Sequence, residues 1–247
     1  YDAPLDEAGN PTEKFMKFRA VIEKHLPAGA KLPAVPAPKP AAALDAIPFS
    51  SGVSIYDYLE KSKHSIQPLT FEDLNQAYGY VLYRTTINGG KQGMLKIDGL
   101  KDFGLVYVNG KRQGVLDRRL NQDSLMINLP SGKVTLDILV ENMGRINFGP
   151  FLLQNKKGIT GKVTLAGAIL ESWDMFSLPF DKQPLKKEVS NAIKQDAPML
   201  KYAEFELKNV QDTYLDMRKW GKGVVWVNGH NLGKYWSIGP QQTIYLP

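Results

Sequence analysis

Apolar and polar side chains alternate along most of the chain, which is the period-two pattern of half-buried β-strands. The alternation is clearest at residues 94–98, 125–129 and 134–140, and a β-branched and aromatic run at 80–87 indicates another strand. Turn residues separate these runs at short intervals, and no helical period lies between them. This part of the chain is therefore predicted to be an antiparallel β-sandwich.

Shorter runs of the same kind predict additional strands towards the C-terminus. They lie at residues 161–170, 203–207, 213–217, 224–227 and 243–246. Between residues 173 and 200, prolines and lysines interrupt the alternation of apolar and polar side chains. A short helical turn is predicted over 185–194.

A five-residue strand–turn unit occurs twice. Val106–Gly110 and Val225–Gly229 both read valine, aromatic, valine, asparagine, glycine. Asn-Gly is the dipeptide that a two-residue hairpin loop prefers, because both of its central residues take positive φ. One copy in each half of the chain predicts two hairpins in two related β domains.

Residues 11–26 have the helical period instead, with one apolar face. Asn10 is the predicted N-cap and Pro11 the first helical position. The apolar face comprises Phe15, Phe18, Ile22 and Leu26. A lone helix of this length is marginal in water, so we expect it to need a partner surface that neighbouring segments do not offer.

Six prolines between residues 27 and 48 predict an extended, semi-rigid connection. The expected organisation is a helical segment at 1–30, a proline-rich linker at 31–48, a first β-sandwich at 49–178 and a second at 179–247. The second sandwich has few strands of its own, and an unpaired sheet edge invites aggregation. Either residues 35–60 complete its sheet or the chain continues in the natural protein.

Composition narrows the class of protein. The 247 residues are 43% hydrophobic and 23% charged, which suffices for substantial cores. The net charge of +6 comes from scattered or paired basic residues, so the clustered basic face that binds nucleic acid is not expected. No apolar run reaches the length of a membrane span, so a membrane is not an expected partner either. Cysteine is absent, which excludes disulfides and thiol nucleophiles.

The sequence contains no motif for metal or cofactor chemistry. A metal site needs clustered ligands, and the three histidines, His25, His64 and His230, are isolated along the chain. The Gly-x-Ser-x-Gly elbow and the lysine-containing phosphate loop are also missing. We therefore expect neither a metal ion nor a cofactor.

Glycoside hydrolysis requires two carboxylates on either side of a sugar ring. The candidates are Glu141, Glu171, Glu204 and Glu206. None has a partner that the spacing identifies, and Glu141 directly follows the strand predicted at 134–140. We expect its carboxylate to accept backbone N–H groups of the turn at 142–144 rather than to act in catalysis.

Aromatic side chains could stack on the faces of sugar rings. Tyr107 and Trp226 occupy the aromatic position of the repeated unit, so we expect both in a core. Trp236, in the loop predicted after the second hairpin, is the candidate sugar-stacking residue, although packing is the favoured interpretation.

The longer motifs resemble one enzyme family. Residues 223–236, followed by Gly-Pro-Gln at 239–241, look like the C-terminal β domain of β-galactosidases in glycoside hydrolase family 35. Residues 79–85 and 139–149 resemble the middle β domain of that family, and the first nine residues resemble the end of its catalytic (β/α)8 barrel. The resemblance therefore covers the chain from end to end.

This resemblance implies an all-β fold of two jelly-roll, galactose-binding-like β-sandwiches, preceded at 1–30 by the last strand end and helix of the barrel. It implies that the parent enzyme hydrolyses terminal β-galactosides with retention, through two glutamates on barrel strands that precede this chain. No catalytic residue is therefore expected here. Tyr1 matches a tyrosine of the family that faces the galactose, which makes it the expected substrate-binding residue.

The resemblance also implies the partners of the chain. They are a β-galactoside in the parent enzyme, the catalytic barrel on which the β domains pack, and further copies of the chain in a homo-oligomer. The implied location is extracytoplasmic, whether secreted, periplasmic or lysosomal. A free-standing carbohydrate-binding module and an oligomerisation domain stay open as alternatives.

Overall fold

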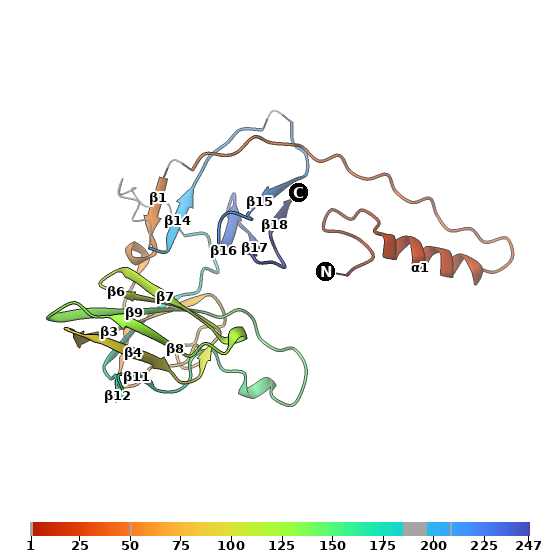
Figure 1. Cartoon of the computed structure of the whole chain (residues 1–247). Coiled ribbons are helices and arrows are strands. Elements are labelled where there is room, and N and C mark those ends of the chain that lie inside the picture. The colour runs from red at the N-terminus through yellow and green to blue at the C-terminus, as the bar shows by residue number, and fades with distance from the viewer. Residues whose placement is uncertain (1, 50, 185–196, 208) are drawn as a thin grey trace. The chain divides into compact units, whose positions relative to one another are not determined.

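The structure, a computed structural model, describes residues 2–49, 51–184, 197–207 and 209–247 and consists mainly of antiparallel β-strands (Figure 1). It divides into a larger unit, Phe49–Tyr202, and a smaller unit that combines Tyr1–Pro48 with Ala203–Pro247. The mainly β character predicted from the alternation is confirmed. The helical turn predicted at 185–194 lies outside the described residues.

Two antiparallel sheets share one core in the larger unit. In the part of the chain that the structure describes, the first sheet has the strand order β2 (Lys63–Ser65), β13 (Trp173–Leu178), β3 (Tyr80–Asn88), β9 (Lys133–Glu141), β6 (Phe103–Val108) and β7 (Lys111–Asp117). The second has the order β12 (Ala168–Ile169), β11 (Val163–Leu165), β4 (Gln92–Ile97) and β8 (Ser124–Asn128). Their side chains meet in one buried cluster that includes Tyr83, Ile97, Ile138 and Trp173.

Period-two alternation decides which side chains enter this core. In β4, Leu95 and Ile97 are fully buried, whereas Met94 and Lys96 are exposed. The strands predicted at 80–87, 94–98, 125–129 and 134–140 correspond to β3, β4, β8 and β9.

The first sheet is covered on its other face as well. A second buried cluster lies there, and the short 3-10 helix η1 (Ile55–Tyr58) contributes to it. Its buried members are Ile55, Leu82, Leu139 and Leu178. Residues of β3 and β9 are therefore buried on both faces, which alternation in sequence did not predict.

This second face contains a charged pair enclosed by aromatic rings. Asp137, a polar position in the alternating run, is only 2% exposed. Arg84 donates to both oxygens of its carboxylate, at 2.7 and 2.9 Å. The Arg84 guanidinium also lies 5.6 Å from the ring centroids of Tyr56 and Phe176. A buried carboxylate is stable here because a bidentate arginine and a cation–π arrangement compensate for its lost hydration.

Both copies of the strand–turn unit form hairpins, as predicted. β6 and β7 turn at Asn109–Gly110, and β16 (Lys222–Val227) and β17 (His230–Trp236) turn at Asn228–Gly229. Both residues of each turn have positive φ, from 50° to 86°. Each hairpin also shifts register immediately before its aromatic residue, Tyr107 or Trp226. The repeated sequence therefore encodes the same bulged hairpin twice.

The smaller unit is built around the second hairpin. β15 (Thr213–Asp216) pairs with β18 (Thr243–Leu246), and Ala41 forms an isolated parallel bridge to Asp212. Its buried cluster comprises Met217, Tyr235 and Ile244.

The strand predicted over 161–170 is wrong in extent. Ala166 and Gly167 have φ values of 49° and 85°, and they reverse the chain between β11 and β12. Two short antiparallel strands replace the single long one because the turn interrupts the ladder.

The strand predicted over 203–207 is also wrong. The nearest strand, β14 (Met199–Tyr202), ends before it and pairs with β1 (Ser51–Ser54). Phe205 and Leu207 are exposed. Alternating side chains do not make a strand where no neighbouring edge offers backbone hydrogen bonds.

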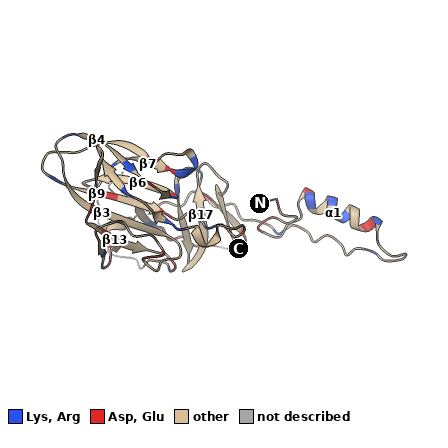
Figure 2. Cartoon of the chain, turned by 90° about the horizontal axis from the view of Figure 1, so that it is seen from below, with Lys and Arg blue, Asp and Glu red and all other residues tan. Residues whose placement is uncertain are grey.

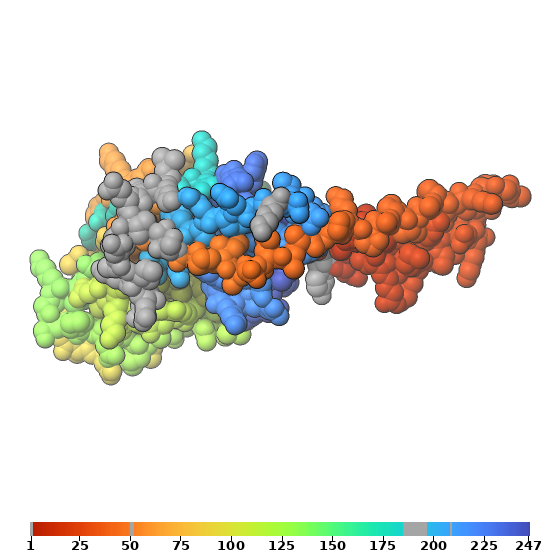
Figure 3. All heavy atoms as spheres, turned by 90° about the horizontal axis from the view of Figure 1, so that it is seen from above, coloured from red at the N-terminus to blue at the C-terminus, as the bar shows by residue number. Residues whose placement is uncertain are grey.

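Helix α1 (Glu13–Lys24) forms as predicted but begins at a different cap. Thr12, not Asn10, is the N-cap, and its Oγ1 accepts the Phe15 N–H at 3.4 Å. The Asn10 side chain donates to Asp6 instead, at 3.1 Å. No residue of α1 is buried, and Figure 3 shows side chains of the red N-terminal segment open to solvent.

Figure 2 shows Lys and Arg along α1 and dispersed over the strands of the larger unit. No helix among the described residues has the length and apolar character that crossing a bilayer requires.

Two carboxylates link the beginning and the end of the loop that leads from β9 to β10 (Gly158–Ile159). Asp102 Oδ2 accepts the Met143 N–H (3.0 Å) at the start of this loop and Lys157 Nζ (2.6 Å) at its end. Glu72 likewise accepts from Arg145 Nη1 (2.5 Å) and from the Lys157 N–H (3.1 Å). We call these five residues the loop clamp.

Electrostatics keep both clamp carboxylates ionised. Burial would raise the pKa of Asp102, but hydrogen bonds from Lys157, the Met143 N–H and Arg118 hold that pKa below its usual value. Burial acts on Glu72 in the same direction, and the Arg145 and Lys157 donors again outweigh it and lower the pKa.

The substitution Lys157→Met tests the clamp. Lys157 and Asp102 are 3% and 8% exposed, so the variant leaves a buried carboxylate without its ammonium partner. We expect a loss of about 3 kcal/mol in unfolding free energy, measured by chemical denaturation. Lys156→Met, on the adjacent exposed lysine, is the matched control and should cost less than about 0.5 kcal/mol. Equal losses in the two variants would contradict a structural role for the pair.

Acid is expected to weaken the clamp through Glu72. Its folded pKa is depressed, so its contribution is complete above the unfolded value of about 4.3 and is lost as the pH falls through the folded pKa. Glu72→Gln removes this titration. The difference in unfolding free energy between wild type and variant should therefore shrink between about pH 6 and about pH 3. If the unfolding free energies of wild type and variant change in parallel with pH over that range, the ionisation of Glu72 does not contribute to stability.

Candidate functional site

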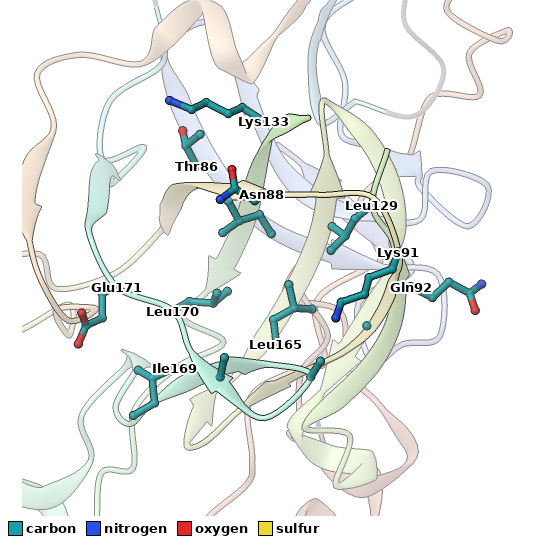
Figure 4. Close-up of a pocket in the computed structure, with 14 residues that line it drawn as sticks. Thr86, Asn88, Lys91, Gln92, Leu129, Lys133, Leu165, Ile169, Leu170 and Glu171 are labelled. Atoms are coloured by element: carbon teal, nitrogen blue, oxygen red, sulfur yellow. The ribbon is translucent and has the colours of Figure 1, made fainter. Parts of the chain in front are cut away.

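A cavity of about 650 Å³ lies where β3 ends and β4 begins, and the β11–β12 turn forms another of its walls (Figure 4). Figure 4 shows Leu165 and Leu170 directed into it and Lys91 reaching toward Leu165, whereas Lys133 extends above Thr86, away from the two leucines. Glu171 is the single carboxylate among the described lining residues, and it points away.

This lining can accommodate a small polar or anionic ligand over an apolar floor. It cannot by itself cleave a glycoside, because that reaction needs two carboxylates about 5 to 10 Å apart on either side of the sugar.

Glu141 and Glu171 do not supply such a pair. Glu141 is in register with Tyr80 at the start of β3, whereas the Glu171 carbonyl accepts a hydrogen bond from Thr85 Oγ1 (3.1 Å). Thr85 lies five residues further along β3, which is about 17 Å of strand. That separation exceeds the range for two groups that act on one glycosidic bond.

Glu141 is buried, and two N–H groups of the turn that follows it donate to other acceptors. The Met143 N–H donates to Asp102 Oδ2 (3.0 Å) and the Gly144 N–H to Asn142 Oδ1 (2.9 Å). Glu204 and Glu206, the remaining candidates, are exposed residues of the smaller unit.

The candidate sugar-stacking residue lies on a strand and not in the predicted loop. Trp236 is the last residue of β17 and is half-buried, opposite Lys222 on β16. Lys222 Nζ lies 4.3 Å from the centroid of the indole ring. A cation therefore occupies one face of the ring. Tyr1, the expected substrate-binding residue, lies outside the described residues.

The histidines occupy three unrelated positions. His25 caps the C-terminus of α1, His230 begins β17, and His64 Nδ1 lies 3.0 Å from Asp174 Oδ1. The described residues contain no group of three or more His, Cys, Asp or Glu side chains that could hold a metal ion.

Two features of the larger unit escaped the sequence analysis. The first is the loop clamp, whose members are far apart in sequence and carry no motif. The second is the loop that it closes, where Phe148, Phe151 and Leu153 are exposed. The signal for the second was available, because the segment from 146 to 155 lacks charged residues.

Two protein-family models match the chain. One, described as "Beta-galactosidase, first all-beta domain", matches residues 68–179, and another, described as "Beta-galactosidase, galactose-binding domain", matches residues 198–247. Over its whole length the chain is 40% identical to a β-galactosidase of Xanthomonas manihotis, 34% to one of Mus musculus and 32% to β-galactosidase 1 of Dictyostelium discoideum. The chain spans 41%, 42% and 41% of the length of these relatives.

A double-mutant cycle on Lys222→Met and Trp236→Leu measures the contact at the candidate stacking residue. We expect a coupling free energy of about 0.5 to 1 kcal/mol in chemical denaturation, because the ammonium lies over the ring. Lys219→Met, on an exposed lysine of the same unit, should show no coupling to Trp236→Leu. A cycle without coupling would contradict a stabilising contact between the ammonium and the indole ring.

Proposed function

Since the chain belongs to the β-galactosidases of glycoside hydrolase family 35, we propose that it forms the non-catalytic C-terminal β domains of such an enzyme. The observation that carries this proposal is the succession of two β-galactosidase β-domain matches, at residues 68–179 and 198–247. The separation of Glu141 from Glu171 along β3 supports it, because these two carboxylates cannot flank one sugar.

The parent enzyme of this proposal removes terminal, non-reducing β-D-galactose with retention of configuration. Retention needs two carboxylates about 5 Å apart, one as acid/base and one as nucleophile. We place both glutamates on a catalytic barrel outside this chain. The support for this placement is that the chain spans 41% of a relative that is named β-galactosidase.

The domain organisation follows from the same proposal. Residues 1–30 are the last strand end and helix of the barrel, 31–48 the linker, and 49–178 and 179–247 two jelly-roll sandwiches. The bare apolar face of α1 supports the first assignment, since a barrel helix packs one face against the strands. Tyr1 would contact the galactose, and the enzyme would act outside the cytoplasm.

A second candidate function is carbohydrate binding by the smaller unit. The observation that favours it is the galactose-binding description of the family model at residues 198–247. Trp236 is the residue that would stack on the sugar, since part of its side chain reaches solvent. A fold name does not establish binding, so this candidate depends on direct measurement.

Hydrolysis of a nitrophenyl β-galactoside tests the first candidate. The 247-residue chain should release nitrophenol no faster than buffer, whereas the same chain preceded by its upstream coding sequence should turn the substrate over. Clear turnover by the 247-residue chain would refute the scaffold assignment.

Calorimetric titration with galactose and galactans tests the second candidate. Heat that Trp236→Ala abolishes and Trp220→Ala retains would establish a binding module. An absence of heat would leave the scaffold function alone.

A further inference from the structure

Hydrogen bonds between segments that are distant in sequence tie together the walls of the cavity in Figure 4. The loop after β3 donates the Gly89 N–H to the carbonyl of Gly132, in the loop before β9, at 2.7 Å. The Ala166 N–H of the β11–β12 turn donates to the Met94 carbonyl of β4 at 2.9 Å. A site whose walls are fixed in this way loses little conformational entropy when a ligand binds.

The floor of the cavity is aliphatic and belongs to the core of the larger unit. Leu129 is 7% exposed and is a member of the buried cluster, and Ile87, Leu165 and Leu170 pack against that cluster. Gly93 lets Leu165 lie close to β4, since a Cβ at residue 93 would stand 2.7 Å from Leu165 Cδ1. None of the described lining residues is aromatic, so the floor has no ring that could stack on a sugar.

The charge that faces this floor is positive. Lys91 reaches toward Leu165, whereas Lys133 extends above Thr86, farther from the floor (Figure 4). Neither ammonium takes part in an ion pair among the residues that the structure describes, and the Glu171 side chain points away. An ammonium over an aliphatic surface without a counterion favours a ligand that brings both negative charge and apolar surface.

We propose that this cavity binds a small amphipathic anion, namely a monocarboxylate with a short aliphatic chain. The Lys91 ammonium holds the carboxylate through a charge-assisted hydrogen bond, and the aliphatic chain covers Leu165 and Leu170. One ammonium over the floor matches a single negative charge, which favours a carboxylate over a phosphate ester with about two.

The size and the place of the cavity agree with such a ligand. Its volume of about 650 Å³ lies within the range of small-molecule sites, about 300 to 1,000 Å³. All of its described lining residues belong to the larger unit, whereas the carbohydrate-binding candidate lies in the smaller one. The inference therefore goes beyond the proposed function and does not depend on it.

Titration with hexanoate tests the site, followed by two-dimensional NMR of the isotope-labelled 247-residue chain. We expect saturable shifts of the amides at 88–93 and 165–171, with a Kd of about 1 mM, the order that ligands of this size reach. Acetate lacks the aliphatic chain and hexanol lacks the charge, so each should bind at least about tenfold more weakly.

The substitution Lys91→Met separates the charge from the floor. Lys91 is exposed, so the Tm of the variant should equal that of wild type. The affinity for hexanoate should fall at least about fivefold, because the carboxylate loses its ammonium, and the affinity for hexanol should not change. Lys111→Met, at the exposed start of β7 and outside the lining, is the matched control and should alter neither affinity.

Each other outcome overturns the proposal in a recognisable way. An absence of saturable shifts removes the site. Hexanoate that binds no better than hexanol, or that binds Lys91→Met as it binds wild type, excludes an anion held by Lys91. Equal affinities for hexanoate and acetate exclude a role for the aliphatic floor, and shifts of the same amides by galactose would make the cavity a sugar site. The scaffold assignment is unaffected by all of these results, because turnover of the nitrophenyl β-galactoside tests it separately.

Discussion

The arrangement of the larger unit depends on the loop clamp. Asp102 and Glu72 each bind the start and the end of one loop, through Met143 or Arg145 on one side and Lys157 on the other. A buried carboxylate without donors would cost several kcal/mol, and closing the loop supplies two of the three donors of Asp102, the third being Arg118. Closure in turn brings the apolar side chains of the loop to the surface. The hydrogen bonds of the loop clamp thus determine which apolar side chains of the loop are exposed to solvent.

Three of the buried acidic side chains of this unit share one feature. Asp102, Asp117 and Asp137 each pair with a basic side chain at 2.6 to 2.7 Å. The charge of each aspartate is therefore compensated within the fold. Their role is to join strands and loops, which is what a supporting domain requires.

Long-range pairing also decides details of the candidate site that the local sequence does not show. The turn after Glu141 donates its Met143 N–H to Asp102, which lies on a different segment. Trp236 was expected in a loop, but pairing with β16 extends the hairpin far enough to include it. In both places a residue from elsewhere in the chain determines the hydrogen bonding.

The sequence by itself determined the local conformations: the alternating strands, the helix after Pro11, the two bulged Asn-Gly hairpins and the family of the chain. These depend on side-chain period, turn propensity and motif, all of which act over a few residues. Tertiary structure decided the covering of the second face of the first sheet, the burial of Asp137 under Arg84, and the clamp around Asp102. Those features depend on which distant segments meet, because hydrogen bonds and ion pairs between segments leave no periodic trace along the chain.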